Sequence, residues 1–415
     1  MSKVTPKSFR SYILFWAGQL ASLLGSTISQ YVIVWWIAFE TESTFYLSIA
    51  SLVGFAPNVV LTPFAGVVAD RLNRKILILV TDLLQATITL MLIFLFWQGN
   101  PSVLHILGLL ALRGGLQAFH RPAFRAVTPT LVPSDKLSRV NGMNYFFSGM
   151  INIMGPAVAA LLLEAWKISQ ILWIDIATFI ICIVPLIAIN IPSVQKKEEK
   201  KSFSKDLQES IMFVKKLVGK TALVVISVIL VVLIVPFNTL LPYFVLFDHL
   251  GGAADLAFVT MVVQSGILAG GVFTSIIKFK KKAITIILLL YGLFAGYAAV
   301  TLAPKGIFWI IAAGGFVMVS AASIIIVLAQ TIIQMIVPLD MQGRADSVVM
   351  TLSFASYPLG MVFSGAIAEY TGVTNIFLAC SILGLIIITA LWMFTDVKRL
   401  EEMIEDENLK VKSEK

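Results

Sequence analysis

Hydrophobic and polar positions follow one another along this chain in long blocks. Twelve apolar stretches, each of 18 residues or more, fall at roughly 11–38, 45–69, 76–98, 102–120, 141–165, 168–190, 221–247, 254–277, 283–303, 306–336, 346–368 and 373–395. A helix of about 20 apolar residues crosses a hydrocarbon core about 30 Å thick. The pattern therefore predicts an all-α integral membrane protein with twelve transmembrane helices.

The composition narrows the class of protein further. Of the 415 residues, 58% are hydrophobic and only 13% are charged, whereas soluble domains carry about 25% charged residues. A soluble enzyme is therefore excluded. Cys182 and Cys380 both lie in apolar stretches without metal-ligand or redox spacing, so neither disulfides nor zinc are expected.

The basic residues predict the orientation in the membrane. Three of the 31 Lys and Arg residues lie apart: Lys167 and Lys305 in odd-numbered loops and Arg113 inside the fourth span. This leaves 28 in the even loops and the termini. Basic loops stay on the cytoplasmic side, so both termini are expected in the cytoplasm. The net charge of +8 then follows from topology, and no nucleic-acid partner is expected.

The chain is predicted to consist of two halves and a linker. The N-terminal six-helix half is 1–190, the cytoplasmic linker is 191–220, the C-terminal six-helix half is 221–395, and a charged cytoplasmic tail is 396–415. Apolar residues recur in the linker at helical spacing between Lys and Glu, at Phe203, Leu207, Ile211, Val214 and Val218. This spacing predicts an amphipathic helix on the inner membrane surface.

The two halves are predicted to be copies of one another. A shift of 205 residues aligns LVPSDKLSR (131–139) with IVPLDMQGR (336–344), and it also matches Gly155 with Gly360 and Lys75 with Lys280. A constant shift over some 100 residues argues against chance. We expect two pseudo-symmetric halves in the same orientation, with a substrate path between them near the midplane.

The loop between the second and third spans carries a known motif. The segment GVVADRLNRK (66–75) resembles the G-x-x-x-D-R-x-G-R-R/K loop of the major facilitator superfamily, with matches at Gly66, Asp70, Arg71, Arg74 and Lys75. Asn73 replaces a glycine, and we expect it to adopt a left-handed turn. Asp70 and the arginines are expected to latch the two halves together on the cytoplasmic side, against the start of the eleventh span. A merely solvated basic loop is the alternative.

Charges inside the spans are the mechanistic candidates. Arg113 lies about 15 Å deep, where an arginine is costly unless it faces protein or water. The segment RGGLQAFHRPA (113–123) resembles the fourth-helix motif of superfamily antiporters, which implies a role in proton coupling. Asp175 is the first candidate for a proton-titrating site or for the partner of Arg113, and Asp82 is expected in the network around Asp70. A permanent structural pairing of Arg113 stays open.

The fifth span resembles the motif g-x8-G-x3-G-P-x2-G-G of superfamily exporters. Gly142, Gly155 and Pro156 match, whereas Ile151 and Ala159–Ala160 depart from it. A Gly-Pro pair bends a helix and small residues allow close packing. We expect these residues to bend the helix, to pack the halves together and to favour export over import.

Taken over nearly the whole chain, the sequence resembles the macrolide-efflux branch of the superfamily's drug and proton antiporters. ASLVGFAP (50–57), AFHRPAFRAVTPTLVP (118–133) and ILWID (171–175) carry this resemblance. It implies the major facilitator fold, a bacterial cell membrane and proton-driven export of small lipophilic drugs, macrolide-like antibiotics foremost. We expect a monomer in the lipid bilayer, with the proton gradient as energy source and no cofactor.

Polar and aromatic residues on helices expected to line the cavity are substrate candidates: Gln19, Gln30, Glu40, Phe237, Asn238, Gln330 and Gln334. LVGKT (217–221) lacks the first glycine of a P-loop, so no nucleotide is expected. The three histidines form no metal-ligand pair, and no metal is expected. Export of a siderophore or other amphiphile, import or lipid flipping, and a receptor without net transport are alternatives. An embedded enzyme is not expected.

Overall fold

The computed structural model describes residues 6–99, 101–133, 136–189, 221–277, 279, 281–336 and 342–394. The amphipathic helix predicted within 191–220 and the tail 396–415 lie outside these residues and stay predictions. The surroundings of some residues within the helices are also not described, among them Gly66 and the side chains of Asp70, Arg71 and Gln334.

The described elements of the first half are all helices, and most of them match the predicted spans to within about five residues. The helices are α1 (Pro6–Thr41), α2 (Thr44–Arg71), α3 (Arg74–Trp97), α4 (Val103–Leu131), α5 (Leu137–Ala165), α6 (Ile168–Ile171) and α7 (Trp173–Ala188). The exception is α4, which ends at Leu131, whereas its span was predicted to end at 120. The connection from α1 to α2 is tight because Glu42 adopts a left-handed φ of 46° and the Ser43 hydroxyl accepts a bond from the Tyr46 N–H. Such a side-chain cap fixes where a helix begins.

The second half repeats this order of helices. Its described elements are α9 (Thr221–Tyr243), the π-helical turn η3 (Phe244–Asp248), α10 (Ala253–Ile276), α11 (Lys282–Thr301), α12 (Phe308–Ile336), α13 (Gln342–Thr371) and α14 (Val373–Phe394). Across the described residues, 11 helical segments are long and apolar enough to span a membrane. Helix α13, with 30 residues, is the twelfth long helix. The predicted all-helical membrane fold is therefore confirmed.

Helix boundaries repeat at the shift that the sequence predicted. Adding 205 to the bounds of α4 gives residues 308 and 336, which are the first and last residues of α12. The same shift carries the starts of α5 and α6 onto the starts of α13 and α14, at Gln342 and Val373. Because boundaries depend on local sequence and not on apolar composition alone, this agreement supports an internal duplication.

A repeated glycine makes the same helix contact in both halves. A Cβ placed on Gly155 of α5 would collide with the Thr27 side chain of α1, and one placed on Gly360 of α13 would collide with the Val235 side chain of α9. Absence of a side chain at this position lets the two helices approach closely. The Gly155 contact lies within the first half, which corrects the prediction that this glycine packs the halves together.

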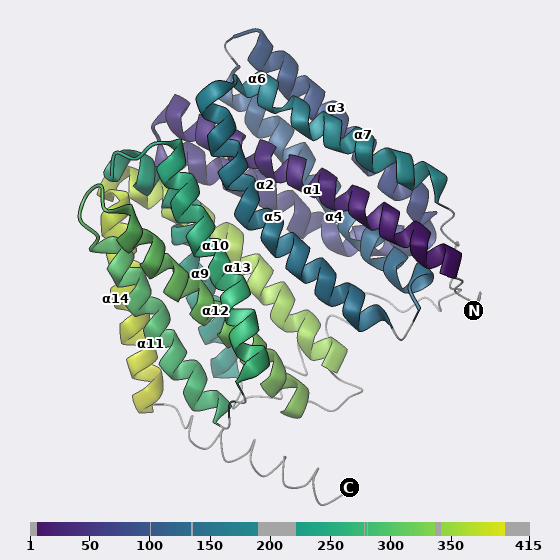
Figure 1. The fold of residues 1–415 in the computed structure, drawn as a ribbon. Helices are drawn as coiled ribbons and strands as arrows, with labels where there is room; N and C mark the ends of the chain where they lie inside the picture. The colour runs from purple at the N-terminus through teal and green to yellow at the C-terminus, as the bar shows by residue number, and fades with distance from the viewer. Residues whose placement is uncertain are drawn as a thin grey trace, which may run out of the picture. The chain divides into compact units, whose positions relative to one another are not determined.

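The chain divides into two compact units. One comprises Met1–Lys197 with Gly252–Ala257, and the other comprises Glu198–Gly251 with Phe258–Lys415. In the first unit α1 packs on α7 and α5, and in the second α11 packs on α12 and α14 (Figure 1).

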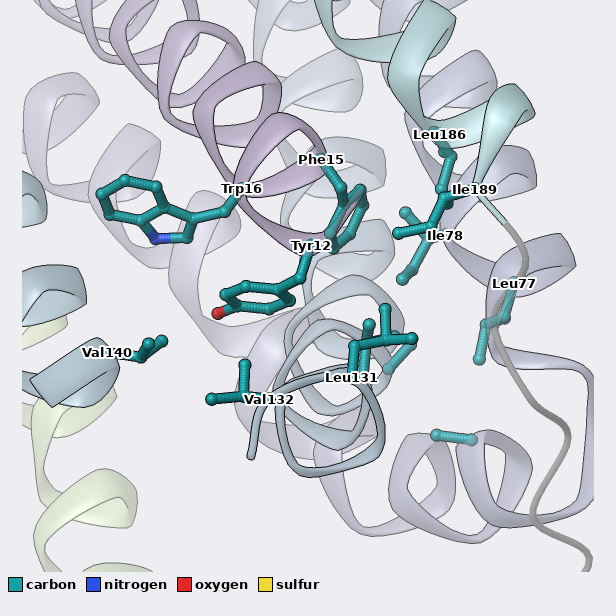
Figure 2. Close-up of a cluster of buried hydrophobic side chains, with 13 residues drawn as sticks. Tyr12, Phe15, Trp16, Leu77, Ile78, Leu131, Val132, Val140, Leu186 and Ile189 are labelled. Atoms are coloured by element: carbon teal, nitrogen blue, oxygen red, sulfur yellow. The ribbon is translucent and has the colours of Figure 1, made fainter. Parts of the chain in front are cut away.

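Two hydrophobic clusters occupy the ends of the first-half bundle. One gathers the starts of α1 and α3 with the ends of α4 and α7, and Figure 2 shows Tyr12, Phe15, Ile78 and Leu186 within it. The other gathers the opposite ends of these four helices, around residues such as Ile37. Buried polar side chains of the same four helices meet between these two clusters.

Candidate functional site

A ladder of polar side chains runs along the interface of α3 and α4 in the first half. The two helices are antiparallel neighbours, so residues at increasing positions on α3 meet residues at decreasing positions on α4. The three levels of the ladder are Thr89 and Arg113, which both donate to Asp175 of α7, then Gln85 with Gln117, and Asp82 with His120. At each level the two residue numbers add to 202, as expected for one straight antiparallel interface.

The first level is a buried ion pair with two further donors, which we call the arginine cluster (Ser26, Thr89, Arg113 and Asp175). Arg113 Nη2 lies 3.1 Å from Asp175 Oδ2, and both side chains are 8% exposed. Thr89 Oγ1 donates to the same oxygen at 2.7 Å, and Ser26 Oγ donates to Asp175 Oδ1 at 2.9 Å. The ion pair predicted for Arg113 and Asp175 is therefore present, with four helices contributing.

A glycine on α1 brings this carboxylate into place. A Cβ on Gly25 would lie 3.0 Å from the Asp175 Cα and would collide with the Thr178 side chain. Helix α1 can therefore approach α7 closely enough for Ser26 to reach Asp175. In the part of the chain that the structure describes, Arg113 Nη1 is buried without a hydrogen-bond partner. The guanidinium thus keeps one donor group that the protein does not use.

The third level belongs to a second cluster, which we call the histidine cluster (Gln19, Asp82, His120 and Cys182). His120 Nε2 lies 3.0 Å from Asp82 Oδ1, although the pair is not aligned as a hydrogen bond. Gln19 Nε2 donates to Asp82 Oδ2 at 3.2 Å and lies 3.0 Å from Cys182 Sγ. The thiol itself lies 4.0 Å from Asp82 Oδ2.

The two clusters are related by a spacing of seven residues on each helix. The pairs are Gln19 and Ser26 on α1, Asp82 and Thr89 on α3, Arg113 and His120 on α4, and Asp175 and Cys182 on α7. Seven residues make about two turns, or about 10 Å along a helix. Each cluster thus combines one aspartate with one basic side chain, and the Gln85–Gln117 bond of 2.8 Å lies between them.

Arg74 and Lys75, two of the three basic residues of the 66–75 loop, have described contacts within their own half. Arg74 Nη1 donates to the Ala126 carbonyl at 2.9 Å, and Lys75 Nζ donates to the carbonyls of Ile187 and Ile189 at 2.6 and 2.7 Å. Cations stabilise the C-terminal ends of helices in this way. The latch predicted for Arg74 and Lys75 between the halves stays a prediction. The latch through Asp70 involves side chains outside the description and stays a prediction.

Asn73 does not adopt the predicted left-handed turn. Its φ of −63° and ψ of 113° are extended, and its side chain accepts a bond from the Lys75 N–H at 3.0 Å. Asn73 is therefore the N-cap of α3, a role that asparagine fills because its side-chain oxygen satisfies a free helix N–H.

Two predicted cavity residues lie in the protein core. Gln19 is 8% exposed and bonded within the histidine cluster, and Phe237 is 0% exposed and packs against Tyr297 and Phe377. Their helices are rotated so that these side chains face neighbouring helices. Gln30, Glu40, Asn238 and Gln330 are exposed, so contact with a substrate stays a prediction for them. Gln334 has no described side chain.

The fifth-span motif gives a mixed result. Gly155 and Pro156 are buried inside α5, whereas Gly142 is exposed and a Cβ there would meet nothing within 4 Å among the described atoms. Close packing therefore requires glycine at Gly155 but not at Gly142. The bend predicted at Pro156 stays a prediction.

The sequence analysis does not identify His120 as a site residue, because the three histidines are far apart in the chain and form no metal-ligand pair. The available signal was the spacing of seven residues. His120 follows Arg113 by seven positions, and Asp82 precedes Thr89 by seven. Polar residues at this spacing lie on one helix face.

Twelve long helices among the described residues, arranged in duplicated halves with charges buried at mid-bundle, are typical of a multi-pass membrane transporter. A family model described as "Transmembrane secretion effector" matches residues 1–413. The chain therefore belongs to this family of the major facilitator superfamily.

Relatives with known names support the efflux branch of the superfamily. Macrolide efflux protein A of Streptococcus pyogenes is 26% identical over 393 residues, which cover 94% of this chain and 97% of the relative. Multidrug efflux pump Tap of Mycolicibacterium fortuitum is 24% identical, with 89% and 91% covered. The crystal structure of a bacterial homologue of the iron transporter ferroportin has the same fold. Its TM-score is 0.71 at 14% identity, with 92% of this chain and 98% of that one covered.

Proposed function

We propose that this transporter exports small lipophilic compounds, macrolide-like antibiotics foremost, in exchange for protons. The buried Arg113–Asp175 pair is the observation that carries the proposal. Ionisable residues inside a membrane span are costly and mark ion or substrate pathways by default. The relatives named for macrolide and multidrug efflux support the direction and the class of substrate.

The arginine cluster suggests how a proton and a substrate exclude one another. The Asp175 carboxylate accepts bonds from three side chains, and the Arg113 bond carries opposite charge. A proton on Asp175 removes that charge and weakens the hold on Arg113. While Asp175 is ionised, the ion pair holds Arg113 so that its free Nη1 donors offer a place for a substrate carbonyl or hydroxyl oxygen. When Asp175 is protonated, the released guanidinium can change partners, and the substrate loses this contact.

Alternating access would couple this exchange to transport. Protonation of Asp175 from the outside favours release of the substrate, and loss of the proton to the cytoplasm restores the ion pair. The two halves would rock about the site between these states. A ligand drives such a change only through its different affinity for the two states, which the switched charge of Asp175 would supply.

The coupling is tested in everted membrane vesicles that contain the protein. Uptake of a radiolabelled macrolide should collapse when an uncoupler is added, and Asp175→Asn should abolish the gradient-driven part. Glu164→Gln is the matched control because Glu164 is an exposed acid in the same half. Uptake that persists without a proton gradient would refute proton antiport.

The substrate class is tested by drug susceptibility of cells with and without the protein. A selective rise in macrolide resistance supports the proposal. Loss of siderophore secretion, or accumulation of a compound inside the cells, would instead favour another cargo or import. Ligand binding with no flux in either direction would indicate a receptor.

A further inference from the structure

The histidine cluster has no part in the exchange proposed for Arg113 and Asp175. Asp82 is 7% exposed, and its two oxygens face His120 and Gln19 from neighbouring helices. One hydrophobic cluster separates it from the start of α1, and the other lies beyond the arginine cluster. Asp82 and His120 therefore lie together at mid-bundle, and the exchange proposed for Arg113 and Asp175 does not use them.

We propose that Asp82 and His120 form a second proton-binding site of the transporter, electrostatically coupled to Asp175 and Arg113. The proposal deepens the proposed proton antiport and rests on it for its role in transport. Binding of a proton by the pair is a separate property that can be measured without transport.

Charge balance supports an exchangeable proton at this pair. Arg113 and Asp175 neutralise each other, so the arginine cluster has no net charge when both are ionised. An ionised Asp82 beside a neutral imidazole would leave one negative charge buried, and a buried charge without a partner is strongly unfavourable. The pair is neutral overall when it holds one proton, as imidazolium with carboxylate or as imidazole with carboxylic acid. That proton comes from water and returns to water.

The geometry permits the proton to leave. His120 Nε2 is close to Asp82 Oδ1 but is not aligned with it, so the pair lacks the fixed geometry of a permanent structural bond. Gln19 and the Cys182 thiol approach the other oxygen. An amide donor and a neutral thiol can hold the carboxylate in place after the imidazolium has lost its proton.

The ladder provides the coupling to Arg113 and Asp175. The clusters are two turns apart on the same four helices, about 10 Å, and charges inside a protein are poorly screened at that distance. The Gln85–Gln117 bond fills the level between them. Protonation of Asp175 leaves Arg113 uncompensated, and its positive charge then disfavours a second proton on His120. The two sites should therefore release protons in sequence.

The helices around Asp82 and His120 carry other charged or titratable groups. Arg74 and Lys75 of α3 bind carbonyl groups. The remaining groups toward the end of the bundle where α1 begins include Arg10 and Tyr12 of α1, Arg121 and Arg125 of α4, Arg139 and Tyr145 of α5, and Asp70 and Arg71 of α2, with no described side chain for Tyr145, Asp70 and Arg71. Tyr31, Glu40, Tyr46, His105 and Glu164 lie toward the opposite ends of these helices, beyond the level of Asp82. Tyr12 is hydrogen-bonded to Thr128. Within the described residues no group of three side chains is suited to hold a metal ion.

Nuclear magnetic resonance of the purified, histidine-labelled protein tests the proposal. The chain has 3 histidines, so His105→Gln and His249→Gln leave the His120 signal assigned. The signal is followed between about pH 5 and pH 9, and we expect its chemical shift to change reversibly as the pair binds a proton. In Asp82→Asn the midpoint should move to lower pH by about one unit or more, and Asp175→Asn should move it in the same direction by a smaller amount.

A His120 signal that stays constant over this range would overturn the proposal, and so would a midpoint that ignores both substitutions. If Asp82→Asn does not fold, the His120 signals of the unmodified protein and of Asp175→Asn still test proton binding and its coupling to Asp175. Transport then tests the role of the site: in vesicles His120→Gln should shift the pH profile of uptake, whereas His105→Gln, an exposed control, should not. A titrating His120 with no uncoupler-sensitive uptake would refute the proposed antiport but not the proton site.

Discussion

The two halves of this transporter share one backbone plan and fill it with opposite chemistry. At the shift of 205 residues, Arg113 corresponds to Met318 and Asp175 to Cys380. Thr89 corresponds to Phe294, Asp82 to Ile287 and His120 to Ile325. Met318, Phe294 and Ile287 are buried, as their charged or polar counterparts are.

The second half therefore shows what the fold requires at these positions. There Phe237, Phe294, Tyr297 and Phe377 are fully buried, and aromatic contacts link Phe237, Tyr297 and Phe377. An apolar core of this kind is sufficient to hold the helices, because hydrophobic packing often replaces a buried ion pair without loss of stability. The second half thus holds the same helices without these charges, and their presence in the first half indicates a function.

The largest effect is expected when the first half is given the residues of the second. Arg113→Met alone leaves Asp175 as a buried charge and should destabilise the protein by about 3–5 kcal/mol. The double substitution Arg113→Met with Asp175→Cys removes both charges and should restore most of that stability. Thermal unfolding in detergent measures the difference, and the double variant should have no uncoupler-sensitive uptake. Equal melting of the single and double variants would contradict this account.

Much of the fold could be predicted from the sequence, because long apolar stretches and the lipid solvent leave few alternatives to helices. The duplication was visible as well, since charged residues in register are conspicuous in a chain so poor in charge. The Arg113–Asp175 pair was predictable for the same reason. Each was a costly charge at similar depth that needed a partner.

The parts of the site that the sequence did not predict depend on how each helix is rotated about its axis. Gln19 and Phe237 face neighbouring helices, and His120 meets Asp82 only because four helices align at one level. An apolar helix gives a weak signal of its buried face, since lipid and protein core favour the same side chains. Asn73 was misjudged for a local reason, because the same residue type suits a left-handed turn and an N-cap.

An intermediate effect is expected where the two halves are alike. Gly155→Ala brings a methyl group against Thr27 and should destabilise by about 1–3 kcal/mol, the usual cost of overpacking. Thr27→Ser removes the contacting methyl and should recover part of the loss. Gly360→Ala, which meets Val235, should have a similar effect in the second half.

Gly142→Ala is the matched control for these glycines. It lies in the same helix as Gly155 with open space around it, so alanine there should be neutral or stabilising by up to about 1 kcal/mol. Thermal unfolding of the four variants measures all these effects. Destabilisation by Gly142→Ala equal to that of Gly155→Ala would show that backbone flexibility, and not the close approach of α1 and α5, explains the glycine.

The smallest effect is expected at the end of α7, which the first half secures with Lys75. Lys75→Met loses both bonds to the carbonyls of Ile187 and Ile189 and should destabilise by about 1 kcal/mol. The last turn of α7 should then open more often. Cys182, a buried free thiol on that helix, becomes the reporter when Cys380 is replaced by serine.

In the Cys380→Ser background, alkylation of Cys182 should be faster with Lys75→Met and unchanged with Lys75→Arg, because arginine can donate to the same carbonyls. Equal alkylation rates in all three proteins would show that Lys75 does not secure α7, and the motif's lysine would then be free for the predicted latch. Lys280 corresponds to Lys75 at the shift of 205. A parallel loss of stability in Lys280→Met would show that both halves use this lysine to stabilise a helix end. If Lys280→Met causes no loss, the lysine cap is specific to the first half, as the buried charges are.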